Sequence, residues 1–120
     1  MREGAVRVAA VVVFAYGTAV HAYDLLRGGL DAYAGYPGWL RGFYTALIVL
    51  DAACAVLIAM RRRAGLVLGS AVLVADALAN GYAVYGLHQG PTIARVGQGV
   101  VSALAVAMVL ASRWLWRSFR

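Results

Sequence analysis

Four long apolar stretches follow one another along the chain, separated by short polar or glycine-rich segments. They cover residues 5–26, 40–60, 64–87 and 96–116. Each comes close to or exceeds the roughly 20 residues that an α-helix needs to cross a bilayer. No proline interrupts them, because Pro37 and Pro91 both stand in connections beside glycines, where turns are expected. The pattern predicts an all-α integral membrane protein, a single four-helix bundle over residues 1–120.

The arginines are unevenly shared between the two ends of this bundle. Three arginines lie beside the first and third connections: Arg27, Arg41 and Arg95. Eight lie near the termini and the second connection: Arg2, Arg7, Arg61, Arg62, Arg63, Arg113, Arg117 and Arg120. Cytoplasmic segments carry the excess of positive residues, so both termini are expected in the cytoplasm. Trp114, Trp116 and Phe119 are then expected in the inner aromatic belt.

The composition excludes a water-soluble domain and therefore changes the interpretation of the positive net charge. Hydrophobic residues make up 63% of the chain and charged residues 13%, too little polar surface for a soluble domain of 120 residues. A net charge of +6 suggests nucleic acid only when basic residues form a stripe on a soluble face. Here they flank apolar runs, so membrane lipid is the expected partner and nucleic acid is not. Basic residues that are all arginine, beside abundant Ala, Val and Gly, are typical of a GC-rich genome, which favours a bacterial cytoplasmic membrane.

Two further features of the sequence are a candidate signal peptide at the start of the chain and a single cysteine. Arg2, Arg7 and the small-residue pattern around His21 are also compatible with a signal peptide that would be removed. Cys54 is the only cysteine, so no internal disulfide is possible, and its apolar surroundings favour inert packing.

Three acidic residues fall within the predicted spans: Asp24, Asp51 and Asp76. An aspartate at the centre of an inserted helix costs roughly 2.5–3.5 kcal/mol, so it is expected to face the protein interior. Asp51 and Asp76 are both predicted near mid-bilayer, where the sequence places no cation. Two such acids close together would share a proton, which favours a role in proton transfer.

Other polar and aromatic residues are predicted at the same level or nearer the outer surface. His21 and Asp24 are spaced i, i+3 and therefore share a helix face. We expect a pocket open to the outer side or the outer leaflet. The candidate catalytic residues are Asp51, Asp76, Asp24 and His21. The candidate ligand-binding residues are Tyr16, Trp39, Tyr44, Asn80, Tyr82 and Gln98. For Asn80, and for Gln98 with Ser102, the alternative to ligand binding is a structural role. Each side chain would then form a hydrogen bond between helices, worth about 0.6 kcal/mol.

Small residues predict close helix packing. Gly65 and Gly69 mark one such face, and a longer ladder follows on the fourth span: Gly99, Ala103, Ala107 and Ala111. Small residues at this spacing let two helices approach closely. Packing within the chain is the first interpretation of the ladder, and a homodimer through the fourth helix is the second.

Several kinds of chemistry fail on residue counts. His21 and His88 are too few to ligate two haems, and P-loop, Ser-His-Asp and zincin motifs are absent. Neither a cofactor nor a metal is therefore predicted. The essential first-helix glutamate of the small multidrug exporters is also missing, although they share this length and helix number.

The chain resembles the EXPERA family of four-helix membrane proteins, which includes the emopamil-binding protein and the sigma-2 receptor. The resemblance rests on His21-x-x-Asp24-Leu25, then Pro37-x-Trp39-x-Arg41-x-Phe43, with Asp51 following in the second helix. It covers about a third of the chain, Asp51 lies about one turn deeper than the family's acid, and the family's third-helix histidine has no counterpart. It implies an acid-lined cavity for a sterol-like or isoprenoid-like ligand.

Three hypotheses follow for function. The first is a pocket for a lipophilic small molecule with acid–base chemistry, an isomerisation or cyclisation through a carbocation. The second is a proton-coupled transporter or channel subunit in which Asp51 and Asp76 titrate. The third is a structural or assembly subunit of a larger membrane complex. An occluded cavity would favour the ligand-binding enzyme. A continuous polar path to the cytoplasm would favour the transporter or channel, and exposed apolar seams would favour the assembly subunit.

Overall fold

The computed structural model describes residues 2–29, 33, 35–87 and 92–120. The described residues form only helices and turns: α1 (Glu3–Gly28), α2 (Gly38–Ala59), α3 (Arg63–Gly81), the π-helix η2 (Tyr82–Gly86) that continues α3, and α4 (Thr92–Leu115). All four predicted spans are present as helices, and each is long and apolar enough to cross a membrane. The predicted all-α four-helix membrane bundle is therefore confirmed.

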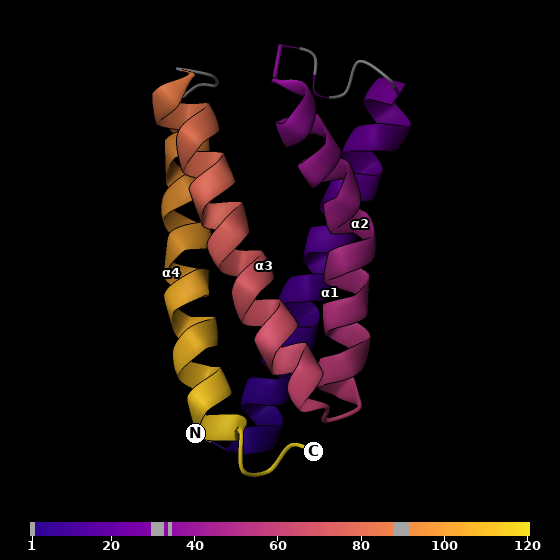
Figure 1. Ribbon diagram of the computed structural model, residues 1–120, viewed down its shortest axis with the longest axis vertical. Helices are drawn as coiled ribbons and strands as arrows, with labels where there is room; N and C mark the ends of the chain where they lie inside the picture. The colour runs from indigo at the N-terminus through magenta and orange to yellow at the C-terminus, as the bar shows by residue number, and fades with distance from the viewer. Residues whose placement is uncertain (1, 30–32, 34, 88–91) are drawn as a thin grey trace.

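The helices pack in chain order, α1 on α2, α2 on α3 and α3 on α4, whereas α1 and α4 touch only slightly. Figure 1 shows two antiparallel pairs, α1 with α2 and α3 with α4, that approach at one end and diverge toward the other. We call the first the terminal end, because it holds both termini and the α2–α3 connection. The second is the loop end, which holds the α1–α2 and α3–α4 connections.

Glycines set the close approach at the terminal end. A Cβ added at Gly65 would lie 2.8 Å from the Leu57 Cβ and 2.9 Å from the Ile58 amide nitrogen. A Cβ at Gly69 would lie 3.0 Å from the Phe14 ring. Only hydrogen fits at these positions without a shift of the neighbours, so the packing predicted for both glycines is confirmed.

The ladder on the fourth span does not pack α4 against α3. Gly99, Ala103 and Ala107 are exposed, and only Ala111 is half-buried. The packing predicted for this ladder within the chain is wrong at those three positions. The helix turns a different face inward, whose buried residues are Ala105, Met108, Ser112 and Leu115.

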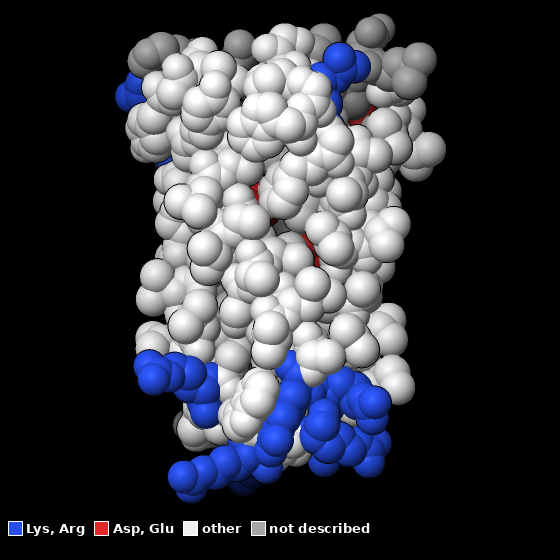
Figure 2. All heavy atoms as spheres, in the orientation of Figure 1, with Lys and Arg blue, Asp and Glu red and all other residues white. Residues whose placement is uncertain are grey.

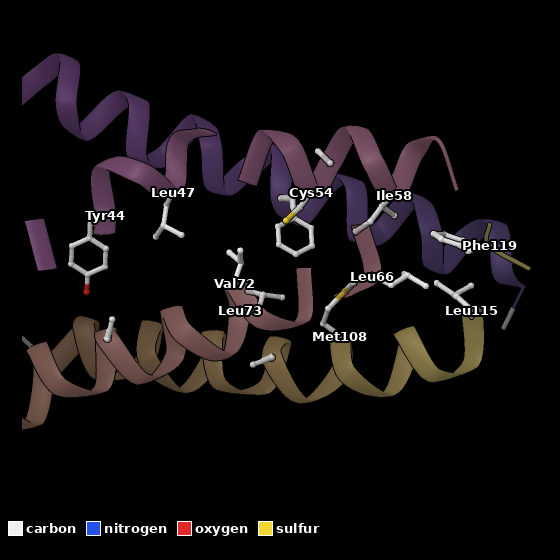
Figure 3. Close-up of a cluster of buried hydrophobic side chains, with 14 of the residues drawn as sticks. Tyr44, Leu47, Cys54, Ile58, Leu66, Val72, Leu73, Met108, Leu115 and Phe119 are labelled. Atoms are coloured by element: carbon white, nitrogen blue, oxygen red, sulfur yellow. The ribbon is translucent and has the colours of Figure 1, made fainter. Parts of the chain in front are cut away.

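Apolar side chains fill the space between the helices in the terminal half (Figure 3). Cys54, Ile58 and Leu66 are fully buried there, with Leu115 and Phe119 nearest the chain termini. Cys54 is thus part of the packed core, as its apolar surroundings in the sequence predict.

Phe119 belongs to this core rather than to an aromatic belt, which corrects the sequence prediction. After α4 the chain bends back, and its last residue pairs with the α2–α3 connection. The Arg120 amide donates to the Arg61 carbonyl at 2.9 Å, and the Arg63 amide donates to the Arg120 carbonyl at 2.8 Å. This clasp turns the Phe119 ring inward, while Trp114 and Trp116 stay exposed as the belt requires.

Candidate functional site

The loop-end half contains a cluster of rings around Tyr44. The His21 ring stacks on Tyr44 with centroids 5.9 Å apart and an interplanar angle of 17°. Tyr33 and Tyr36 lie 5.2 and 5.8 Å from the same ring. The His21 Nδ1 is 3.3 Å from the Tyr33 hydroxyl, which places the two groups in hydrogen-bond contact. We call His21, Tyr33, Tyr36 and Tyr44 the tyrosine cluster.

Three segments build this cluster. His21 lies on α1, and Tyr44 projects from α2, which begins directly after Pro37. Tyr33 and Tyr36 come from the connection, where a turn joins the Tyr36 amide to the Tyr33 carbonyl at 3.2 Å. Neither connection residue was among the predicted site residues, although the density of glycine and tyrosine in 27–39 was a visible signal. Residues 30–32 and 34 of the same connection lie outside the described residues.

Asp76 lies on α3, within electrostatic range of this cluster. Its Oδ1 atom is fully buried and has no hydrogen-bond partner among the described residues. Burial, followed by the charges of Asp24, of Tyr36 and of Asp76, raises the pKa of Tyr33 to about 12. Asp76 is the smallest of these contributions, so its carboxyl group lies within electrostatic range of Tyr33. Figure 3 shows the Tyr44 hydroxyl pointing from α2 toward α3, the helix that carries Asp76.

Asp51 occupies a tighter place, between α1 and α2. It is 6% exposed, and a Cβ built on Gly17 would overlap its Oδ2 and lie 3.1 Å from its Cγ. Beside this contact, the Thr18 hydroxyl donates to the Ile48 carbonyl at 3.1 Å. Asp51 is therefore buried, and Asp76 is half-buried with its Oδ1 atom inside the protein.

Gln98 and Ser102 make the structural bonds that were the alternative to a site. The Gln98 Nε2 donates to the Ala77 carbonyl at 3.3 Å and to the Ser102 hydroxyl at 3.0 Å. The Ser102 hydroxyl donates back to the Gln98 carbonyl at 2.9 Å. Gln98 therefore joins α4 to α3, and its bonds account for its burial without a ligand.

The remaining predicted residues lie at different distances from the cluster. Asp24 is half-buried, and its charge acts on both His21 and Tyr33. Asn80 is half-buried one turn beyond Asp76. Tyr16 is 70% exposed, so the structure does not bring it to the cluster. His88, whose role the sequence left open, lies outside the described residues.

Trp39 and Tyr82 meet over the loop end. Their ring centroids are 5.6 Å apart at an interplanar angle of 41°, which joins the start of α2 to η2. Tyr82 opens the π-helix, a distortion that recurs at functional sites. The pair links the two helix pairs on the loop side of the tyrosine cluster.

The face drawn in Figure 2 is hollowed between the helices, and acidic atoms are recessed there while arginines crowd the terminal end. Among the described residues, no three His, Cys, Asp or Glu side chains are grouped so that they could hold a metal ion. The described residues of the loop-end half thus include carboxyl groups, an imidazole and several aromatic faces. No family model, curated protein or solved structure matches the chain.

Proposed function

We propose that the protein binds a lipophilic small molecule between its helix pairs in the loop-end half and performs acid–base chemistry on it. The observation that carries the proposal is the buried Oδ1 of Asp76, which has no hydrogen-bond partner among the described residues and lies within electrostatic range of the tyrosine cluster. A buried polar atom without a partner is costly in a folded protein, and a ligand that supplies the partner removes this cost.

The aromatic lining indicates the class of ligand. Ring faces such as those of Tyr44 and Tyr36 attract positive charge within about 6 Å, so they would stabilise a cation formed on an apolar molecule. The resemblance to the EXPERA family points in the same direction, toward a sterol-like or isoprenoid-like alkene. We propose that such an alkene lies between Asp76 and the rings.

The proposed reaction is an isomerisation through a carbocation. Asp76 in its protonated form donates its proton to one carbon of the double bond, and the cation develops on the other. A neighbouring C–H bond then gives its electron pair to form the new double bond, and its proton passes to His21. Tyr33, which is protonated at neutral pH, holds the His21 ring in place through Nδ1. Asp51 packs closely against Gly17, so we propose that it does not touch the ligand. Its proposed role is to influence Asp76 electrostatically.

We further propose that the terminal end faces the cytoplasm of a bacterial cell. Eight of the eleven arginines belong to that end, as the positive-inside rule requires of a cytoplasmic face. The ligand would then enter from the outer leaflet or the outer side.

The transporter hypothesis has less support, because the core of the terminal half is apolar. A relay to the cytoplasm would need titrating groups or water beyond Asp51, whereas Cys54, Ile58 and Leu66 fill that level. The assembly-subunit hypothesis draws on a different feature. An apolar groove of about 130 Å³ runs between α1 and α4, lined by residues that include Val13, Ala107 and Ala111. This groove is also where a homodimer through the fourth helix would form.

Solvent deuterium tests the proposed chemistry without knowledge of the product. The purified protein is incubated in D₂O with a panel of sterols and isoprenoid alkenes, and mass spectrometry measures deuterium in the recovered lipid. Proton donation from Asp76 followed by loss of another proton leaves deuterium on carbon. Asp76→Asn keeps the shape but removes the proton, so deuterium uptake should fall by roughly 10²–10⁴-fold while the lipid still binds.

Two further variants complete the experiment. Asp51→Asn should retain most of the uptake if Asp51 only supports Asp76. Ser102→Ala removes a bond within the bundle away from the cluster and controls for general loosening. Deuterium uptake that is equal in the parent and in both aspartate variants would remove the acid–base hypothesis and leave the assembly subunit ahead.

A further inference from the structure

A second hollow lies at the opposite end of the molecule, between α3 and α4. It is an open groove of about 470 Å³, and its apolar wall is formed by residues that include Leu66, Val67 and Val109. Two hydroxyl groups lie in it, those of Ser70 and Ser112, 3.0 Å apart. The groove is therefore apolar along its length, with a small polar patch near the terminal end.

Arginines line the mouth of this groove. Arg113 lies in the last turn of α4, and Trp116 and Arg117 lie in the turn that directly follows the helix. Arg63 adds a third guanidinium at the edge, since its Nε donates to the Trp116 carbonyl at 3.0 Å and its Cζ lies 4.9 Å from the Trp116 ring centroid. No ion pair to Arg113 or Arg117 is formed by the described residues, so both charges are open to an external anion.

The apolar surface continues beyond the mouth. A second open groove of about 370 Å³ shares Val109 with the first and extends between α3 and α4 to Ser102, lined by residues such as Val74 and Val106. From Arg113 to Ser102 is eleven residues of α4, or roughly 16 Å at about 1.5 Å per residue. One leaflet contributes roughly half of the 30 Å hydrocarbon core of a bilayer. The two grooves together therefore span about the depth of one leaflet.

The geometry points to a binding site for one anionic phospholipid on this face. The phosphate lies between Arg113 and Arg117, whose planar guanidinium groups match phosphate oxygens in bidentate fashion. An acyl chain follows the α3–α4 grooves past Val109, and the Ser70 and Ser112 hydroxyls lie near the glycerol region. The positive-inside rule explains arginines at this end, but it does not explain an apolar groove of leaflet length beneath two of them. The site is independent of the acid–base chemistry proposed for the loop end.

Native mass spectrometry of the full chain in a maltoside detergent tests this assignment. The protein is titrated with phosphatidylglycerol, phosphatidylcholine and inorganic phosphate as separate probes. We expect one phosphatidylglycerol per chain to bind at least tenfold more tightly than phosphatidylcholine. Each arginine near an anionic lipid surface contributes a free energy equivalent to about fivefold in affinity, so Arg113→Gln with Arg117→Gln should weaken binding by about 25-fold.

The matched control is Arg2→Gln with Arg62→Gln, which removes the same charge from exposed residues of the same end that do not line the groove. Its affinity should stay within about twofold of the parent. A second pair tests the groove itself: Val109→Trp fills the part that both grooves share, whereas Val12→Trp adds the same bulk to the exposed surface of α1. Only Val109→Trp should displace the lipid.

Three results would overturn the site. Equal binding of phosphatidylglycerol and phosphatidylcholine would show an unspecific annular lipid. Equal losses in the two double-arginine variants would show a diffuse effect of charge. Displacement of the lipid by millimolar inorganic phosphate would show that the headgroup binds without the groove.

Discussion

Asp51 and Gln98 show how a buried polar side chain is accommodated in different ways. Gln98 uses its amide to join α4 to α3 and is satisfied within the protein. The Asp51 carboxyl group packs against Gly17, because the missing side chain at that glycine leaves space for it. The Asp76 Oδ1 atom is buried and has no hydrogen-bond partner among the described residues. This difference separates a structural residue from a candidate for ligand contact, and residue type alone does not reveal it.

The contact between Gly17 and Asp51 leads to a stability prediction. Gly17→Ala places a methyl group against the Asp51 carboxyl group, and such overpacking typically costs about 1–3 kcal/mol. The melting temperature in a fixed detergent should therefore fall. In the double variant Gly17→Ala with Asp51→Ala, the added methyl group meets no carboxyl group, so the Gly17 substitution should cost less there than in the parent.

Gly42→Ala is the matched control, because nothing lies within 4 Å of a Cβ at that position of α2. It should be neutral or stabilise the protein by up to about 1 kcal/mol, through the gain in helix propensity. A melting temperature that rises equally for Gly17→Ala and Gly42→Ala would contradict the close approach of α1 and α2 at Asp51.

At the scale of elements, the last turn of the third span differs from the rest of its helix. The Leu87 amide donates to the Tyr82 carbonyl at 2.9 Å, an i to i+5 bond that defines the π-helix η2. A π-turn inserts an extra residue and rotates the side chains that follow it relative to a regular α-helix. Periodicity predicted a continuous helix over 64–87, because an apolar pattern does not reveal one extra residue in one turn.

The ring contact between Trp39 and Tyr82 should couple α2 to η2. Offset or tilted aromatic pairs contribute about 0.5–1.5 kcal/mol beyond their buried area. A double-mutant cycle with Trp39→Ala and Tyr82→Ala, measured by denaturant unfolding in detergent, should show a coupling energy in that range. The comparison cycle uses Tyr85→Ala, an exposed tyrosine of the same π-helix, and should give a coupling near zero. Equal coupling in both cycles would mean that the Trp39–Tyr82 contact does not join the helices.

At the scale of the whole molecule, the two ends have different chemistry. The terminal end is closed by an apolar core and by the backbone bonds of Arg120, and it carries most of the positive charge. The loop end holds the rings and acids where the helix pairs diverge. The buried acids and the ring cluster therefore lie away from the arginine-rich end.

The orientation prediction can be tested with single cysteines in intact cells. Gly4→Cys and Ser118→Cys place exposed thiols near the two termini, and Gly38→Cys places one at the start of α2. A membrane-impermeant maleimide should label Gly38→Cys from outside and should reach the other two only after lysis. The parent protein is the control, because its Cys54 is buried and should stay unlabelled. Labelling of residue 4 or 118 in intact cells would reverse the orientation and the assignment of leaflets.

The sequence by itself determined the number of spans, their limits to within four residues, and the inward direction of Asp51 and Asp76. It did so because a bilayer imposes one rule on every residue: apolar length must match its thickness, and charge must be hidden from lipid. The same rule says nothing about which inward group meets which neighbour. Asp51 and Asp76 look equivalent in the sequence, but the Asp51 carboxyl group packs against Gly17, whereas the Asp76 Oδ1 is buried without a hydrogen-bond partner among the described residues.

The structure alone brought Tyr33 and Tyr36 back over Tyr44, placed Phe119 in the core and turned the ladder of α4 outward. These features depend on where a connection folds and on which face of an apolar helix meets its neighbour. In a helix that is apolar on every side, periodicity cannot select that face, because lipid and protein interior favour the same side chains. Only the packing of the four helices decided it.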